Sequence, residues 1–302
     1  MRRSLPALIA LALVAGAALT GCSTDTVGEA GACTVKSGSA SESIRATGAF
    51  GTDPKAKVPS PLNATRTEAT TLIKGDGKVV GKGGVAVVSF TFFEGTTGEA
   101  ADTAVNYTPI TSKAIGSGLA NALSCARVGS RIAVVVPPKE GASMFGVGDG
   151  HSLVAIADVE RALPARATGS RRAATPGFPT VVLAPNGQPG IVVGDRSEPK
   201  KLNAAVLREG DGSVTKKTDT LIVQTQTVSW ADPTTATGTW EDGSPTTQTL
   251  SDGTALSKEL VGRKVGSQVI VLLPKSDTQS GAAEVTVVDI LGRVPAGSTG
   301  GN

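Results

Sequence analysis

The side chains that most often perform catalysis are sparse in this chain. His151 is the only histidine among 302 residues, and it follows a GVGDG turn without a second histidine or a free cysteine beside it. A Ser-His-Asp triad is therefore untenable, and His151 is better interpreted as a loop or strand-start residue. The glycine-rich stretch GKVVGKGG (77–84) lacks the spacing of a phosphate-binding loop. The scattered carboxylates form no metal-binding pattern, so we expect neither cofactor nor metal.

The first cysteine belongs to a targeting segment. Arg2 and Arg3 precede an apolar run that is too short to span a bilayer, and the run ends in LTGC with Cys22 last. This pattern resembles the lipobox of bacterial lipoproteins, and the alternative is an ordinary cleaved signal with a chance cysteine. The resemblance implies a signal peptide over 1–21 and a lipid on Cys22. It predicts an exported protein, anchored only by that lipid to the outer face of the cytoplasmic membrane.

The two remaining cysteines, Cys33 and Cys125, form an even pair. Export exposes them to oxidising conditions, which favours a disulfide between them; the alternative is two buried free thiols. Cys33 lies in a polar segment that offers little reason for burial, so we favour the disulfide.

Charge excludes nucleic acid as a partner. The chain has 29 basic and 26 acidic residues, and removal of residues 1–21 takes away two positive charges. Phosphate binding needs clustered lysine and arginine. The basic cluster of Arg166, Arg171 and Arg172 lies in a Gly/Ser/Ala-rich stretch, which we interpret as a solvated linker.

The chain contains an internal repeat. VGSRIAVVVPP begins at Val128 and VGSQVIVLLPK begins at Val265, 137 residues later. Two GDG triplets lie 135 residues apart, and DVERAL from Asp158 corresponds to DILGRV from Asp289 at a spacing of 131. Preserved order with changing offsets indicates two homologous domains that differ in loop length.

Each copy is mainly β. VAVVSFTFF (85–93) and its counterpart TLIVQTQTV (220–228) are β-branched and aromatic, as strands require. SGLANALSCARVG predicts a short helix with Ser117 as its N-cap and apolar residues at helical spacing. Buried strands from the repeated VGS segments and a last strand complete the unit. The sequence predicts an α+β fold: two tandem domains, each an antiparallel curved sheet packed on one short helix.

These pieces, in this order, resemble the FKBP family of peptidyl-prolyl cis-trans isomerases. The residues that carry the resemblance are the GDG turn, the strand around Phe90, SGLANALSCARVGSRIAVVVPP and LVAIADV, with TWEDGSP, ELVGRKVGSQVIVLLP and VTVVDILG in the second copy. ALSCARVGSR with GAFGTDP and PSPL upstream is similar to exported actinobacterial proteins with tandem FKBP domains. The match covers residues 46–162 and 178–294.

The resemblance implies a site without a nucleophile or base. Rotation of an X–Pro amide crosses a barrier of about 18–20 kcal/mol, and the twisted amide is less charge-separated than the planar one. An apolar pocket that removes water therefore favours the transition state. By resemblance, Phe90, Leu119 and Ala155 line the pocket and the Ile115 backbone N–H holds a ligand carbonyl. Asp102 and Phe145 are expected at the family's buried Asp and flap Tyr, and a plain core is the alternative for Phe90, Ile115 and Leu119.

The second copy has lost this pocket chemistry. Thr225 and Thr286 replace pocket aromatics, Ala236 and Thr237 replace a Phe-Asp pair, and Trp240 alone matches the family. Polar side chains would admit water, so we predict that this domain is catalytically inactive.

The leading interpretation is an FKBP-type isomerase that acts on proline-containing segments of exported proteins. The rivals are an inactive FKBP-fold chaperone or peptide binder and a structural envelope lipoprotein. We expect a monomer. Its expected segments are a signal peptide (1–21), a flexible tether (22–45), domain 1 with an N-terminal extension (46–162), a linker (163–177), degenerate domain 2 (178–294) and a disordered tail (295–302).

Overall fold

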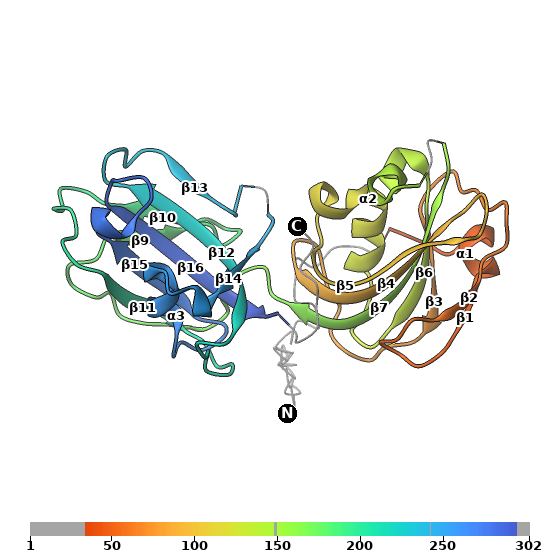
Figure 1. Cartoon of the computed structure of the whole chain (residues 1–302), viewed down its shortest axis with the longest axis horizontal. Helices are drawn as coiled ribbons and strands as arrows, with labels where there is room; N and C mark the ends of the chain where they lie inside the picture. The colour runs from red at the N-terminus through yellow and green to blue at the C-terminus, as the bar shows by residue number, and fades with distance from the viewer. Residues whose placement is uncertain (1–33, 148–149, 242, 295–302) are drawn as a thin grey trace, which may run out of the picture.

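A computed structural model describes residues 34–147, 150–241 and 243–294 of the chain. Within these ranges two β-rich domains lie side by side (Figure 1). Cys22, Cys33, the expected signal peptide and the expected tail lie outside the described residues.

The first domain is built on a five-stranded antiparallel sheet in the order β3-β6-β7-β4-β5. Its strands are β3 (Glu68–Ile73), β4 (Val85–Glu94), β5 (Ala100–Pro109), β6 (Arg131–Val136) and β7 (Leu153–Leu163). The β-branched run of β6 is buried along its whole length, because both faces of the sheet are covered.

One face of this sheet packs on helix α2 (Ser112–Ser124), whose buried side chains share a core with residues of β4, β6 and β7. The regular part of this helix starts at Ser117, as expected, but a short helical turn precedes it. That turn begins at Ser112, and its N-cap is Thr111, whose hydroxyl accepts a hydrogen bond from the Ala114 amide at 3.3 Å. Backbone angles leave the helical region at Ile115 and Gly116, so the stretch predicted from Ser117 is the part that follows this kink.

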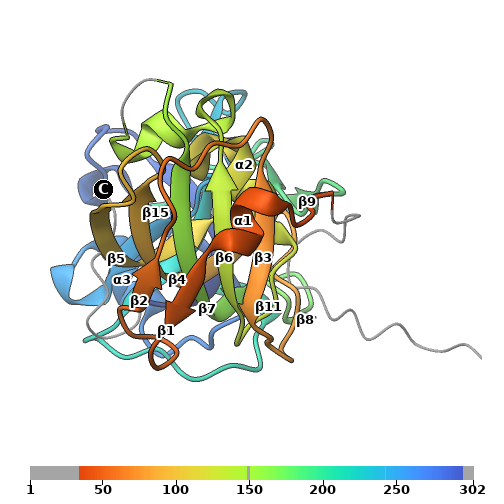
Figure 2. The same cartoon turned by 90° about the vertical axis from the view of Figure 1, so that its right-hand side faces the viewer.

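The opposite face is covered by the N-terminal extension. Helix α1 (Ser39–Ser43) and the hairpin of β1 (Arg45–Thr47) and β2 (Lys55–Lys57) lie across it (Figure 2). Ala40, Ser41 and Ile44 are buried there. The expected flexible tether was therefore wrong for residues 39–45, since the Glu68 carboxylate accepts hydrogen bonds from the Ala40 and Ser41 amides and holds α1 on the sheet.

The second domain repeats the sheet order of the first. Its path is β13-β12-β16-β15-β11-β8, with β14 also paired to β12. The elements are β8 (Ser170–Arg171), β9 (Thr180–Leu183), β10 (Pro189–Val192), β11 (Asn203–Glu209), β12 (Thr220–Ser229), β13 (Ala236–Gly238), β14 (Thr246–Thr249), α3 (Ala255–Leu260), β15 (Gln268–Leu273) and β16 (Glu284–Arg293). Short 3₁₀ turns are η3 (Leu250–Asp252) and η4 (Lys275–Asp277) in this domain, and η1 (Pro138–Glu140) and η2 (Ala142–Phe145) in the first domain.

The strand registers confirm the α+β duplication. Glu68 lies opposite Val135 in the first domain, and Asn203 lies opposite Leu272 in the second. The two residues of the second pair follow those of the first by 135 and 137 positions, the offsets of the GDG and VGS triplets. The repeat also includes the covering hairpin, because β9 and β10 occupy in the second copy the sequence position of β1 and β2.

The segment over 163–177 is not a solvated linker. β8 pairs with β11, and the Ala167 amide donates to the buried Asp289 carboxylate at 2.8 Å. The Gly169 amide also donates to the Gly266 carbonyl. These bonds tie the segment to the second sheet, so composition alone misjudged it.

The two sheets touch where their strands end. Val85, Ile222 and Leu291 are buried together there, with Leu163 and Val294 packed against them. The described helices are all too short to cross a bilayer as an apolar span.

Candidate functional site

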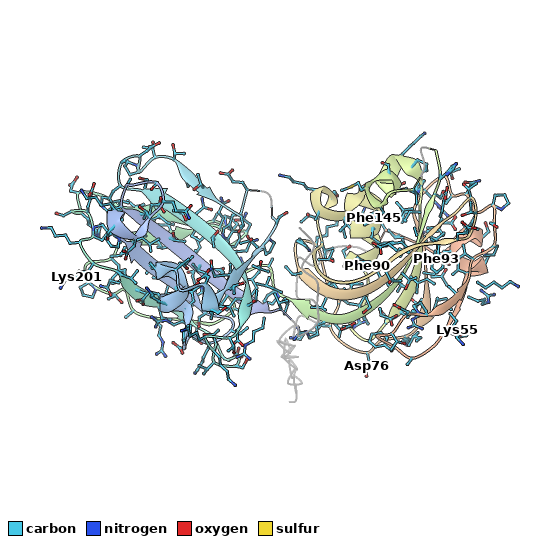
Figure 3. The ribbon with its side chains drawn as sticks, viewed as in Figure 1. Lys55, Asp76, Phe90, Phe93, Phe145 and Lys201 are labelled. Atoms are coloured by element: carbon cyan, nitrogen blue, oxygen red, sulfur yellow. The ribbon has the colours of Figure 1, made fainter. Side chains whose placement is uncertain are left out.

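The strongest candidate site is an aromatic cluster in the first domain. Side chains alternate along a strand, so Phe90 and Phe92 of β4 share the face toward α2. Their rings are stacked with centroids 5.1 Å apart, and the Phe145 ring lies 4.9 Å from that of Phe92. Figure 3 shows Phe90 and Phe145 together beside α2, whereas Phe93 points to the opposite face.

Three further predicted residues join this cluster. Ile115 and Leu119 come from α2, and Ala155 comes from β7, directly opposite Phe92 in the sheet register. Leu119 and Ala155 are fully buried. The structure places five of the six residues that the resemblance indicated in the main hydrophobic core of the first domain, where the alternative of a plain core also puts Phe90, Ile115 and Leu119: Phe90, Ile115, Leu119, Phe145 and Ala155.

Asp102 is the exception. It lies opposite Phe92 on the edge strand β5, which places it on the same face of the sheet. Its side chain is exposed, and its carboxylate accepts a hydrogen bond from the Thr103 amide at 2.7 Å. Asp102 therefore lies at the rim of the cluster, where water can solvate it, and not among the buried rings.

Phe92 was missed by sequence reasoning. It is two positions beyond Phe90 in the same strand, so strand alternation was the signal that could have found it. Only 6% of its surface is exposed, and it lies between the other two rings. Phe92 therefore fills space between Phe90 and the segment carrying Phe145.

The expected hydrogen-bond donor of the site is already engaged. The Ile115 amide donates to the Thr111 carbonyl at 3.2 Å, within the first turn of α2. This bond follows from the N-cap at Thr111, which brings its own carbonyl over the amide of Ile115. A ligand carbonyl at Ile115 would have to share or replace this bond.

The segment that carries Phe145 is held against the start of α2 by two glycines. Gly116 and Gly141 both have positive φ, and a Cβ added to Gly116 would lie 2.9 Å from the Gly141 Cα. Only glycine permits this approach of two backbones. The contact seats η2 over the cluster, with Phe145 half-buried and the neighbouring Met144 exposed.

The cluster is a packed group of side chains in this structure. Three hollows among the described residues lie elsewhere, and none of the six predicted site residues lines them. The members of the cluster are almost fully buried, apart from the half-buried Phe145. Entry of a proline ring between Phe90 and α2 would require Phe145 to move.

The second domain has threonines where the first has phenylalanines. In the second sheet Thr225 and Thr227 lie opposite Val288 and Thr286. In the first sheet Phe90 and Phe92 lie opposite the corresponding residues, Ala157 and Ala155. Thr225 therefore corresponds to Phe90, and Thr227 to Phe92. The Thr227 and Thr286 hydroxyls are 2.9 Å apart and share a hydrogen bond. Trp240 is buried, and its indole N–H has no hydrogen-bond partner among the described residues.

The cysteine chemistry is partly visible. Cys125 is disulfide-bonded, and its partner lies outside the described residues. Val35 and Cys125 line the same hollow beside the end of α2, so the chain just after Cys33 passes close to Cys125. No group of three or more potential metal-ligating side chains occurs in the described ranges.

The comparisons with known proteins give structural likenesses alone. No family model matches the sequence, and no curated protein matches it either. The similar solved structures are FKBP-type domains and peptidyl-prolyl isomerases, and some of them contain several such domains.

Three of these structures show the level of likeness. The three FKBP domains of a wheat protein are 14% identical, with 76% of this chain and 94% of that chain covered and a TM-score of 0.32. A peptidyl-prolyl isomerase from Pseudomonas syringae pv. tomato is 18% identical over 32% of this chain and 74% of its own, with a TM-score of 0.29. FkpA from Escherichia coli is 20% identical over 38% and 52%, with a TM-score of 0.28. The strand order and registers described above, and not these likenesses, are the ground for assigning both domains one fold.

Proposed function

We propose that the chain is an FKBP-type peptidyl-prolyl cis-trans isomerase whose activity resides in the first domain. The observation that carries this proposal is the contact of Phe92 with Phe90 and with the half-buried Phe145, within the hydrophobic core that also buries Ile115, Leu119 and Ala155. Such a cluster can remove water from a prolyl peptide bond, and the twisted amide tolerates that loss better than the planar amide.

Access to the site depends on Phe145. Its turn η2 lies between Gly141 and Gly146, and both glycines have positive φ. Phe145 is half-buried and contacts the cluster through Phe92, so its displacement would uncover the Phe92 ring. In this proposal a proline ring takes the place of Phe145, and its flanking carbonyl competes with Thr111 for the Ile115 amide.

We also propose the setting of this activity. The substrates are proline-containing segments of exported polypeptides, and the protein is a monomer held by a lipid on Cys22 at the outer face of the cytoplasmic membrane. Support comes from the LTGC pattern and from the disulfide at Cys125, which suits an oxidising compartment. Mass spectrometry of the mature protein tests the anchor. An unmodified N-terminal residue other than Cys22 would refute it.

A prolyl-peptide assay on the full chain tests the activity. The full chain is needed because the extension over 34–57 covers one face of the sheet. We expect accelerated isomerisation that falls at least tenfold in Phe90→Ala. Thr225→Ala, at the matched position of the second domain, should keep the wild-type rate. Equal rates for Phe90→Ala and wild type, with both folded by circular dichroism, would exclude this site.

A second function has one specific observation in its favour. The rings pack on one another and the Ile115 amide is bonded to Thr111, so the cluster leaves no free donor at Ile115 for a prolyl bond, and an FKBP fold without isomerase activity is the alternative. Suppression of the aggregation of an unfolded client by wild-type protein that accelerates no prolyl isomerisation would establish this alternative. A protein with neither effect would leave a structural role in the envelope.

A further inference from the structure

The two domains differ in what covers the outer face of the first strand of each sheet. In the first domain, α1 lies over β3, and the Ser41 hydroxyl is 2.8 Å from the Thr70 hydroxyl. In the second domain, Ala205 of β11 takes the place of Thr70, since Thr70 lies opposite Ala133 and Ala205 lies opposite Ile270. The chain that follows β8 forms no helix over it.

A hollow of about 540 Å³ occupies this place in the second domain. We call it the arginine hollow. Phe178, Ala205 and Leu207 form its apolar lining, which we call the floor, and Gln268 also lines it. In the first domain the corresponding space is filled by a segment of the chain itself, with Ala40 and Ile44 buried against the sheet.

The rim of the arginine hollow is basic. Four arginines line it, and no aspartate or glutamate does: Arg171, Arg172, Arg196 and Arg208. Arg172 lies 3.7 Å from Glu209 outside the hollow, while Arg196 and Arg208 each donate one hydrogen bond to a backbone carbonyl. A guanidinium has five N–H donors, so these contacts leave donors for a ligand.

We propose that the arginine hollow binds a short acidic segment of a polypeptide partner that also carries apolar side chains. The first domain shows that this face of the sheet accepts a peptide segment, because α1 lies on it. The rim selects carboxylates, since a guanidinium fork pairs with a carboxylate in a bidentate manner. The apolar floor favours a partner that buries aliphatic groups between its acidic residues. The site is separate from the aromatic cluster, so the two proposals stand independently.

Fluorescence anisotropy on the full chain tests this inference with labelled, end-blocked hexapeptides. The probe alternates glutamate and leucine; one control peptide has glutamine for glutamate and the other has serine for leucine. We expect the probe to bind at least tenfold more tightly than either control peptide, and binding to weaken with added salt.

Variants locate the site. Arg172→Glu reverses a rim charge, and Thr175→Trp places a bulky ring at an exposed lining position. Each should weaken probe binding at least tenfold, whereas Arg66→Glu, an exposed arginine of the first domain, should not. All variants should keep the circular dichroism spectrum and the prolyl isomerase rate of wild type.

Three results would overturn the proposal. Unchanged binding in Arg172→Glu and Thr175→Trp would place the peptide elsewhere. Equal affinity for the serine control would reduce the hollow to a plain anion site. Arginine-dependent binding to anionic lipid vesicles, without binding of the probe, would show that the hollow faces a membrane surface.

Discussion

Arg131 offers the sharpest test of how the first domain is held together. Its side chain is fully buried and pairs with Asp158 through two contacts of 2.6 and 2.7 Å. The same guanidinium donates to the carbonyls of Gly48 and Ala49 at 3.1 and 2.9 Å, in the loop between β1 and β2. One side chain therefore joins the sheet to the hairpin that covers it.

Replacing Arg131 with Met should destabilise the first domain by about 4 kcal/mol. Loss of one partner from a buried ion pair costs about 3–5 kcal/mol, because the other charge stays buried without compensation. The lost hydrogen bonds to the Gly48 and Ala49 carbonyls should cost less free energy, since these carbonyls can turn toward water. Whole domains are stable by about 5–15 kcal/mol, so the loss is a large share. Arg131→Gln should cost less, because in the second domain Gln268 occupies this position and donates to Asp289 at 2.7 Å.

Urea unfolding measures this change with an internal control. Both tryptophans, Trp230 and Trp240, lie in the second domain, so tryptophan fluorescence reports that domain while far-ultraviolet circular dichroism reports both. We expect Arg131→Met to move the circular dichroism transition of the first domain to a lower urea concentration. The fluorescence transition, which reports the second domain, should stay at the same urea concentration. Arg127→Gln, at an exposed arginine that donates to the Gly77 carbonyl, should shift neither. A cost below about 1 kcal/mol for Arg131→Met would refute the reasoning that the buried pair anchors the hairpin.

Two further predictions follow from the same structure. Burial raises the pKa of Asp289 from 3.8 to about 6 despite its hydrogen bonds from Ala167 and Gln268. Between these values the folded state holds more protons than the unfolded state. The free energy of unfolding of the second domain should therefore fall as pH rises from about 4 to 7, by up to about 3 kcal/mol. Urea unfolding followed by fluorescence at several pH values measures this slope, and the same slope in Asp289→Asn would contradict the prediction. Gly116→Ala should loosen the segment over 138–145, seen as faster amide hydrogen exchange there, at a cost of about 1–3 kcal/mol. Gly83→Ala, which also has positive φ but meets no atom within 4 Å, is the control and should lack this local effect.

Much of the fold could be predicted from the sequence because its signals are local or repeated. The strands at 85–93 and 220–228 follow from β-branched and aromatic composition. The duplication follows from matched triplets, and it implies a common strand order without any knowledge of packing. Phe90, Leu119 and Ala155 were found through the resemblance, since each lies at a fixed distance from a recognisable segment.

Other features depended on contacts between residues far apart in sequence. The segment at 39–45 looked like a tether because its residues are small and polar. The Glu68 carboxylate of β3 nevertheless holds it in place, by accepting hydrogen bonds from the Ala40 and Ser41 amides. The segment at 163–177 looked like a linker for the same reason, and Asp289 holds it through Ala167. In both cases a partner more than 25 residues away supplies the hydrogen bond, and composition carries no record of that partner.

The amino-acid sequence by itself determined that two related β-rich domains exist and where their main strands fall. Only the tertiary structure decided that Phe92 and Phe145 fill the space beside Phe90, that Asp102 lies in solvent and that four arginines surround one hollow. The physical reason is that strand alternation assigns a side chain to a face, whereas the packing of covering segments decides whether that face is filled, open or wet.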